Sequence, residues 1–449
     1  MNIGEKKLLF SNKDLVNLII PLIIEQLLAM LVGLADSIMI ANVGESAVSG
    51  VSLVDGCMML LINAFTALAT GGAVVAGQWL GSEDRERATE SAQQLIWFIT
   101  ILSVIVMGLV YFYRNALLFN VFGQITDEVR GYARVYLLIV TASIPFIALY
   151  NGGSAVFRAM GDSKTPMSIS IKMNIINVIG NAILIYGFHR GAEGVAIPTL
   201  VSRMYAAFAV IILLLNDKLT LHIKKTLHYK PDFGIIKKIL YIGVPYGMEN
   251  SMFQLGKILV LSLVSTFGTY AIAANAVCNV LAGFQILPGM AAGLAVTTVI
   301  SRCIGANDYD QARYYTRKLH GFAWAGLLFS VILIWLVMPP ILKIYNLSPE
   351  ATEAARRIMY LHGGSALLIW PLSFTLPSVF RAAGDIKFAM IVAIVSMWIC
   401  RVVFSYILGR NMGLGVFGVW IAMIMDWAAR SVCFVIRYKS GKWKGKAVV

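Results

Sequence analysis

The chain has 449 residues, of which 59% are hydrophobic and only 13% are charged, and its mean hydropathy is +0.77. A soluble protein of this length could not bury so much apolar surface, whereas a lipid bilayer solvates it, so the composition predicts an all-α integral membrane protein. The net charge of +14 does not indicate a nucleic-acid partner, because Lys and Arg cluster in alternate loops, as they do in membrane proteins.

Twelve apolar stretches follow one another along the chain, each long enough to cross a hydrocarbon core of about 30 Å. We predict transmembrane helices at about 15–41, 46–78, 91–113, 132–157, 164–187, 194–216, 236–267, 271–301, 319–342, 358–380, 387–409 and 414–437. The lipid bilayer is therefore the first expected partner of this chain.

Basic residues lie unevenly in the loops between these stretches. If the N-terminus lies inside, the inner side holds most of the basic residues, among them Lys6, Lys7, those of the connector Lys218–Lys238 and those of the tail Arg437–Lys446. The outer side holds few basic residues, such as Arg114. Because cytoplasmic loops are enriched in Lys and Arg, we predict a multi-pass protein of the plasma or inner membrane with both termini in the cytoplasm.

The second half of the chain repeats the first at an offset of 224 residues (245 − 21). The matches include Pro21 with Pro245, Glu25 with Glu249 and Gly81 with Gly305. Phe-Arg-Ala-Met-Gly-Asp at 157–162 also matches Phe-Arg-Ala-Ala-Gly-Asp at 380–385, one residue out of register (380 − 157 = 223). A run of matches at one spacing indicates an internal duplication. Each copy holds an even number of spans, six, which predicts two parallel six-helix repeats with a cleft between them.

The domain boundaries follow from this repeat and from a polar connector rich in Lys and His. We predict an N-lobe at 1–216, a cytoplasmic linker at 217–235, and a C-lobe with a basic tail at 236–449. The linker is interpreted as a solvated connection between the lobes, and the chain is expected to be a monomer.

Motifs of nucleotide-driven or hydrolytic chemistry are absent from the sequence. Neither G-x-x-x-x-G-K-[ST] nor His-Glu-x-x-His, Cys-x-x-Cys or Gly-x-Ser-x-Gly occurs. We therefore predict that the protein is not an enzyme, holds no cofactor or metal cluster, and uses an ion gradient of H+ or Na+. The five cysteines have no metal-ligand spacing and are interpreted as small buried hydrophobic residues.

Ionisable side chains inside the spans are the candidates for function. Each costs about 2.5 kcal/mol or more in lipid and must face protein or water. They are Glu25, Asp36, Asp55, Lys172 and Arg203 in the first half, and Glu249, Lys257, Arg401, Asp426 and Arg430 in the second.

Asp36 is the leading candidate for coupling transport to a cation. Its equivalent in the second half is Val260, and a costly carboxylate kept in one lobe only is harder to explain by architecture, although a satisfied structural acid is the alternative. Glu25 and Glu249, by contrast, occupy equivalent positions four residues after Pro, which suits a structural role as well as a role in transport.

Three asparagines on the fifth span can serve Asp36. Asn174, Asn177 and Asn181 are spaced to share one helix face, and Asn181 lies at a similar predicted depth to Asp36. Their amides can contact a carboxylate that alternates between charged and protonated forms, with ordinary interhelical hydrogen bonding as the alternative. Lys172 and Arg203 are the candidate charge partners of Asp36 in this scheme.

In the second half, Asp426 has Arg430 four residues later and Arg401 at a comparable depth on the preceding span. We predict ion pairs among these three within the C-lobe. Asp55 and Lys257 are secondary candidates. Aromatic and Met residues such as Phe253 and Phe374 are interpreted either as the lining of an adaptable apolar cavity or as ordinary core and lipid-facing residues.

Taken in order, these features resemble multidrug and toxic compound extrusion (MATE) transporters over essentially the whole chain. The resemblance rests on Asp36-Ser-Ile-Met-Ile-Ala-Asn-Val-Gly44 after Pro21, its echo from Gly243-Val-Pro245 to Gly268, and the paired Arg-Ala-x-Gly-Asp turns. It implies a two-lobe, V-shaped, cation-coupled antiporter that exports amphipathic, often cationic drugs or toxic compounds by alternating access.

The resemblance also carries site residues over to this chain. The first-helix acid that couples transport in the family is matched by Asp36, and the fifth-helix polar pair is matched by Asn177 and Asn181, where proton-coupled members have Asp at position 181. Sodium-coupled members carry acids on helices seven and ten. Here Glu249 lies about one turn earlier on helix seven and helix ten offers His362, so H+ and Na+ both stay open, with a slight preference for H+ at Asp36 and with Glu249 or Asp36 as the candidate Na+ ligand.

A flippase for lipid-linked or polysaccharide precursors is the alternative function. It is expected to line its cleft with basic residues for a diphosphate, whereas the ionisable residues in these spans are mixed in sign. A membrane-embedded enzyme would need a nucleophile and base or a metal site, and a channel would need a pore-ring motif, neither of which the sequence contains.

Overall fold

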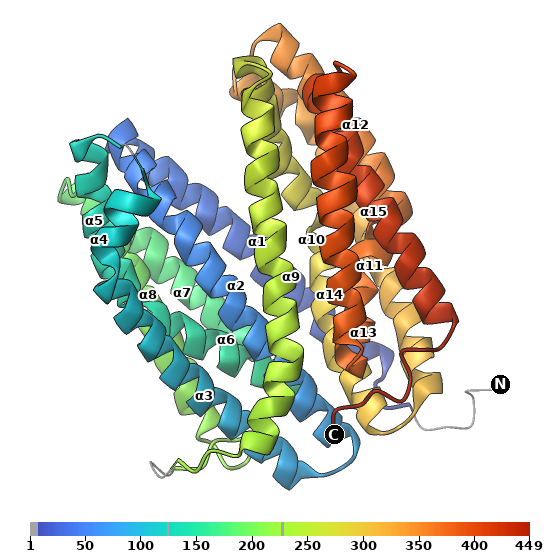
Figure 1. Cartoon of the computed structure of the whole chain (residues 1–449). Helices are drawn as coiled ribbons and strands as arrows, with labels where there is room; N and C mark the ends of the chain where they lie inside the picture. The colour runs from blue at the N-terminus through green and yellow to red at the C-terminus, as the bar shows by residue number, and fades with distance from the viewer. Residues whose placement is uncertain (1–7, 124, 226–228) are drawn as a thin grey trace. The chain divides into compact units, whose positions relative to one another are not determined.

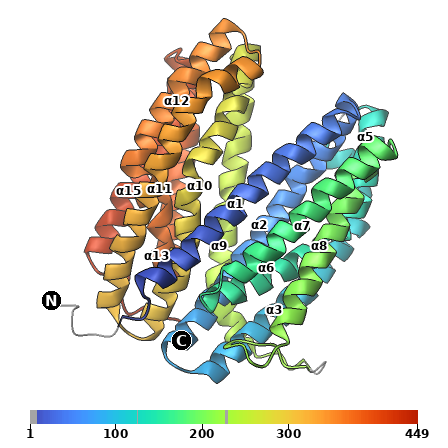
Figure 2. The same cartoon turned by 180° about the vertical axis from the view of Figure 1, so that it is seen from behind.

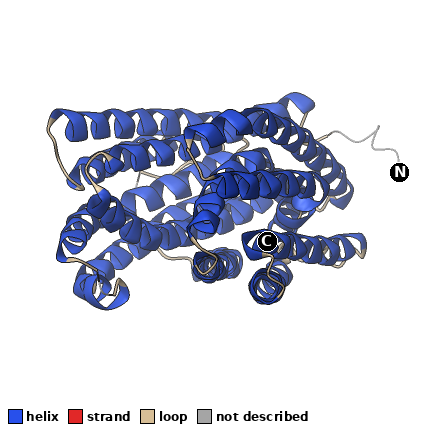
Figure 3. Ribbon diagram, turned by 90° about the horizontal axis from the view of Figure 1, so that it is seen from above, coloured by secondary structure: helices blue, strands red, loops and turns tan. Residues whose placement is uncertain are grey.

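The computed structural model describes residues 8–123, 125–225 and 229–449. Every regular element in these residues is helical and none is a strand, as Figure 3 shows. The predicted all-α class is therefore confirmed. Lys6 and Lys7, on which part of the charge argument rests, lie outside the described residues.

Ten helical segments of the described chain are long and apolar enough to cross a membrane, and a bent pair of helices makes an eleventh. A further helix of 33 residues, α9 (Phe233–Ser265), is the remaining long segment (Figure 1). Together they correspond to the twelve predicted spans, and the fifth, Lys164–Gly187, has the predicted bounds. The protein is thus a multi-pass membrane protein.

The chain divides into two compact units, one of Met1–Leu15 with Met248–Val449 and the other of Val16–Gly247. The sequence predicted a boundary between the lobes at the linker. The observed boundaries instead fall within two long helices, α1 (Asn12–Ala41) and α9. The first turn of α1 belongs to the later half of the chain, and the first half of α9 belongs to the earlier half.

The unit Val16–Gly247 contains most of α1 and the first half of α9. Its other elements are α2 (Glu45–Gly81), α3 (Arg85–Phe112), α4 (Arg114–Ala116), η2 (Leu117–Val121), α5 (Asp127–Thr141), α6 (Ile144–Ala159), α7 (Lys164–Ala182), η3 (Ile183–Gly187) and α8 (Glu193–Leu214), where η marks a π-helical segment. Helix α2 packs against α3, α5 and α6, and α7 against α8 (Figure 2). Helices α2 and α9 approach closely at Gly71 of α2, because a Cβ at this position would lie 2.6 Å from the Ile239 carbonyl oxygen of α9.

The fourth predicted span is broken rather than continuous. Helices α5 and α6 meet at an angle of 47° around Ala142 and Ser143. Pro145 stands in the first turn of α6, where a missing N–H and a restricted preceding residue end the helix before it. The bend leaves the Ser143 hydroxyl available to a neighbouring helix, which matters for the site described below.

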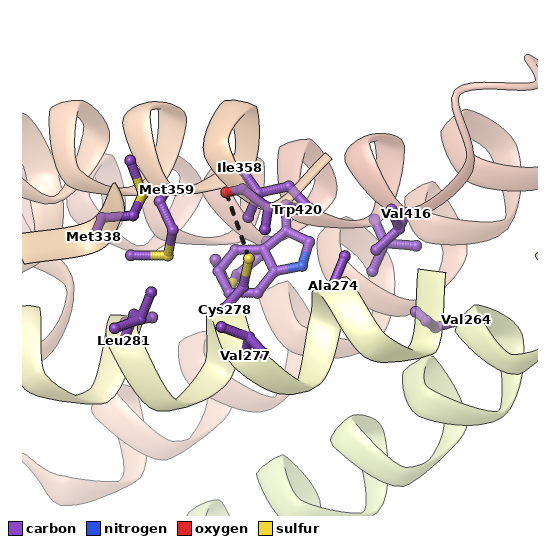
Figure 4. Close-up of a cluster of buried hydrophobic side chains, with 14 of the residues drawn as sticks. Val264, Ala274, Val277, Cys278, Leu281, Met338, Ile358, Met359, Val416 and Trp420 are labelled. Carbon is purple, nitrogen blue, oxygen red and sulfur yellow. Dashed lines mark hydrogen bonds between the residues drawn. The ribbon is translucent and has the colours of Figure 1, made fainter. Parts of the chain in front are cut away.

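The second unit holds the rest of α9 and the remaining elements. These are α10 (Thr269–Gly305), α11 (Tyr309–Ile344), α12 (Pro349–Trp370), η4 (Pro371–Thr375), α13 (Pro377–Ala383), α14 (Ile386–Ser396), η5 (Met397–Val403), η6 (Tyr406–Asn411) and α15 (Gly415–Lys439). Its apolar core lies between α10, α12 and α15, where Cys278, Met359 and Trp420 pack together (Figure 4). Cys278 and Cys303 are buried as expected, but Cys433 is exposed on α15, so the buried interpretation is wrong for that residue.

The start of α1 is fastened to α11 of the same unit. The Phe10 N–H donates to the Tyr315 hydroxyl oxygen at 2.8 Å, and that hydroxyl donates to the Phe10 carbonyl oxygen at 2.8 Å. The Leu9 N–H donates to Oε1 of Gln311 at 2.9 Å. These bonds satisfy backbone groups that precede the first helix and explain why this short segment clusters with the later half of the chain.

Candidate functional site

Asp36 is the first member of a row of hydrogen-bonded polar side chains inside the unit Val16–Gly247. The Asn181 amide donates from Nδ2 to Oδ1 of Asp36 at 2.6 Å, and also to Oδ1 of Asn177 at 3.4 Å. Asn177 in turn donates to the Thr199 hydroxyl at 3.1 Å. Asp36 is half-buried, whereas Asn181 is fully buried, so the carboxylate is the accessible end of the row.

Two helices hold this row in place. Asn177 and Asn181 lie one turn apart on α7, and Thr199 lies on α8 beside Pro198. A Cβ on Gly180 would lie 2.7 Å from Cβ of Pro198, so a glycine is needed for the helices to approach this closely. Thr199 was missed from the sequence because a single Thr in an apolar helix is an ordinary residue.

A second set of polar groups lies around Arg203 of α8. Tyr136 donates to Oδ1 of Asp55 at 2.8 Å, and Arg203 donates from Nη1 to the Ser143 hydroxyl at the α5–α6 bend at 2.8 Å. Arg203 attracts both Asp36 and Asp55, and these two carboxylates repel one another. The structure thus brings together three predicted residues and adds Tyr136 and Ser143, which nothing in the spacing indicated.

Two buried polar atoms on this face of α7, one acceptor and one donor, are not used in hydrogen bonds among the described residues. Oδ1 of Asn181 is buried and has no hydrogen-bond partner among the described residues. Asn174 is also buried, and its Nδ2 has no partner in the same residues. Carboxylate and amide oxygens are acceptors that suit a proton or a hard cation. The described residues contain no group of three His, Cys, Asp or Glu that could hold a metal ion.

Lys172 does not join Asp36. It is exposed on α7, and it makes no hydrogen bond or ion pair with a described residue. The asparagines lie on the buried face of α7. Because Lys172 comes two residues before Asn174, its side chain points to a different face of the helix. Arg203 is therefore the basic residue that acts on Asp36 in this unit.

Glu25 and Glu249 each form an ion pair within their own unit. Arg158 lies 3.4 Å from Glu25, which also accepts from the Tyr150 hydroxyl at 3.2 Å, and Arg381 lies 3.7 Å from Glu249. Both arginines come from the repeated Arg-Ala-x-Gly-Asp turns, so the duplication has preserved the pair as well as its members. On helix α12, His362 contacts Gln285 at 2.6 Å rather than an acid.

We expect Glu25→Gln and Glu249→Gln to lower the thermal stability of the protein by similar amounts, about 1–3 kcal/mol each, because a buried charged partner loses its counter-charge. The measurement is the unfolding temperature of the purified protein in detergent, with the exposed Glu45→Gln as control. A loss of cation-dependent transport at unchanged stability would instead assign Glu249 a coupling role.

The second unit contains a separate group of charges around Asp426 of α15, which is fully buried. Arg430 donates from Nε to Oδ1 of Asp426 at 2.8 Å, and Ser396 donates to the same oxygen at 2.7 Å. Arg401 lies on the π-helical segment η5, and its Nη1 is 4.0 Å from Oδ2 of Asp426. Lys257 of α9 is exposed, and the positive charge of Arg401 acts on it.

Comparisons with known proteins agree with this architecture. A model of the MatE family matches residues 21–183 and 245–407, which begin 224 residues apart (245 − 21) and end 224 apart (407 − 183). The uncharacterized transporter YisQ of Bacillus subtilis is 28% identical over 95% of this chain and 94% of its own. The probable multidrug resistance protein NorM of Thermotoga maritima is 25% identical over 97% and 94%. A solved multidrug resistance MATE family transporter in an outward-facing conformation matches with a TM-score of 0.89 at 22% identity over 96% of both chains, which shows a shared fold.

Proposed function

This chain belongs to the MatE family of membrane transporters, and we propose that it is a cation-coupled antiporter that exports amphipathic, often cationic drugs or toxic compounds by alternating access. Relatives of this chain are named as transporters and as probable multidrug resistance proteins. The expectation of a transporter rather than an enzyme is thereby confirmed. The proposal places it in the plasma or inner membrane as a monomer with both termini in the cytoplasm.

The observation that carries the proposed coupling is the row from Asp36 through Asn181 to Thr199. Asp36 is the half-buried end of a row of buried polar side chains, and it is attracted by Arg203 and repelled by Asp55. Binding of H+ or Na+ removes its negative charge. The charge change alters the hydrogen bond of Asp36 with Asn181 of α7 and its attraction to Arg203 of α8.

Substrate export follows if the two charge states of Asp36 favour different packings of this unit. A cation that binds one packing more tightly shifts the population toward it, and a substrate that prefers the other packing is released. The coupling is reciprocal, so substrate binding must also promote cation release. We propose H+ as the coupling ion because a single half-buried carboxylate with amide neighbours suffices to hold a proton, with Na+ at Asp36 or Glu249 as the alternative.

Ethidium efflux from cells expressing the protein tests this function. We expect efflux that stops when a protonophore collapses the proton gradient and that continues when sodium is removed from the medium. Loss on sodium removal would assign Na+ instead. Absence of efflux of any cationic dye by well-expressed protein would contradict the antiporter and favour a flippase, whose need for basic residues is met in part by the second unit.

A further inference from the structure

Three cationic side chains surround one aromatic ring in the second unit. The guanidinium carbons of Arg401 and Arg430 lie 5.1 Å and 5.6 Å from the centre of the Phe253 ring, and the ammonium of Lys257 lies 5.9 Å from it. They come from η5, α15 and α9 respectively, so residues distant in the sequence converge on this ring. The convergence was not apparent from the sequence, where the charges of the spans looked mixed in sign.

The single acid beside these cations forms the predicted ion pairs with Arg430 and Arg401, and one negative charge leaves the group of three cations with a net positive charge. Oδ1 of Asp426 is already occupied by Arg430 and Ser396, and its Oδ2 has no hydrogen-bond partner among the described residues. Arg401 approaches that oxygen only to 4.0 Å, which is too long for a hydrogen bond. One carboxylate therefore faces three cations, and it is hydrogen-bonded to only one of them, Arg430.

Arg401 and Lys257 are left with unused donors. Arg401 is only 9% exposed, and its guanidinium makes no hydrogen bond to a described residue. Lys257 is exposed and likewise has no hydrogen-bond or ion-pair partner in the described part of the chain, while the charge of Arg401 repels it. Lys257 has no counter-charge among the described residues and Arg401 has only the ion pair with Asp426 at 4.0 Å, so a bound anion would relieve the repulsion between two like charges within membrane-spanning helices.

The surroundings favour an anion that carries an apolar body. Phe253 lies edge-on to Phe374 at 6.5 Å, and Phe374 stacks on Trp370 at 5.0 Å, which provides a continuous aromatic surface beside the charges. Arginine offers a planar pair of donors to a carboxylate or phosphate, and lysine offers a mobile point charge. The two types together can hold an oxyanion from two sides.

We propose that Lys257 and Arg401 bind the carboxylate or phosphate group of an amphipathic molecule whose apolar part packs against Phe253 and Phe374. This site belongs to the second unit alone and is distinct from the Asp36 cluster. It rests on the proposed function in one respect, namely that the bound molecule is a transport substrate. Under this proposal the protein accepts zwitterionic or anionic amphipathic compounds in addition to cationic ones.

The test is a binding titration with the purified full-length protein in neutral detergent. The probes are 1-pyrenebutyrate and its neutral analogue 1-pyrenebutanol, followed by fluorescence. We expect the wild type to bind the carboxylate at least tenfold more tightly than the alcohol. Lys257→Met should remove this preference while leaving the affinity for the alcohol unchanged, and Arg401→Gln should do the same if its unfolding temperature stays near that of the wild type.

Lys172→Met is the matched control, since Lys172 is also an exposed lysine within a span but belongs to the other unit. Equal binding of the two probes by the wild type, or an unchanged preference in Lys257→Met, would overturn the proposal. Displacement of pyrenebutyrate by phosphatidylglycerol but not by phosphatidylcholine identifies a lipid headgroup as the source of the anion, and lack of displacement identifies a soluble compound. A failure of dye efflux with intact pyrenebutyrate binding would contradict the proposed function and leave this site standing.

Discussion

Asp36→Asn is expected to reduce cation-driven dye efflux by more than tenfold while the protein remains folded. The amide keeps the shape of the carboxylate. Its oxygen can still accept from Nδ2 of Asn181, which donates to Oδ1 of Asp36 at 2.6 Å in the wild type. It cannot alternate between a charged and a neutral form, so the cation no longer drives a change of packing. The measurement is ethidium efflux against a gradient, normalised to the amount of protein in the membrane.

Two controls make the Asp36 result specific. Glu45→Gln removes an exposed acid from the start of α2 and should leave efflux unchanged. Downhill ethidium movement by Asp36→Asn should persist, because the variant loses coupling rather than the transport pathway. Active efflux against a gradient by Asp36→Asn would show that the coupling cation binds elsewhere, with Glu249 as the next residue to replace.

Asp426→Leu is expected to destabilise the protein by about 3–5 kcal/mol, because removing one partner of a buried ion pair leaves the other charge without compensation. Arg430 is only 3% exposed and would lose the carboxylate that accepts from its Nε, and Ser396 would keep only the Ala393 carbonyl oxygen, at 3.3 Å, as an acceptor. The measurement is thermal unfolding of the purified protein in detergent, followed by intrinsic tryptophan fluorescence, together with the yield of folded protein.

The double variant Asp426→Leu with Arg430→Met separates the charge effect from a packing effect. Replacing both members of a buried pair by apolar residues of similar size is often close to neutral, so we expect the double variant to recover most of the lost stability. Glu353→Gln removes an exposed carboxylate that pairs with Arg356 and Arg357, and should change the stability by less than about 1 kcal/mol. A double variant as unstable as Asp426→Leu would mean that shape, not charge, is decisive at this position.

Local sequence patterns were sufficient for the membrane class, the succession of spans and the internal repeat. The length of an apolar segment shows whether it can cross a membrane, and a duplication leaves a constant spacing between matching residues. Both can be recognised without knowing which helices contact one another. The shared face of Asn177 and Asn181 was likewise predictable, since helical periodicity alone places residues four apart on one side. The equivalence of Glu25 and Glu249 followed from the 224-residue offset in the same way.

The partners of these residues were decided only by the tertiary structure. Asn181 reaches Asp36 across 145 residues of sequence, and Thr199 reaches Asn177 because Gly180 lets α8 come close. The bend before Pro145 delivers Ser143 to Arg203.

The grouping of charges in space is the feature that the sequence predicted least well. Counted along the spans, acids and bases looked mixed, yet helix packing gathers Lys257, Arg401 and Arg430 around Phe253 with a single acid between them. The sequence by itself determined that these residues are charged and lie within the membrane. Which of them share a neighbourhood, and hence what they can bind, depends on the rotation and approach of helices, because a local pattern of residues carries no information about the face that another helix presents.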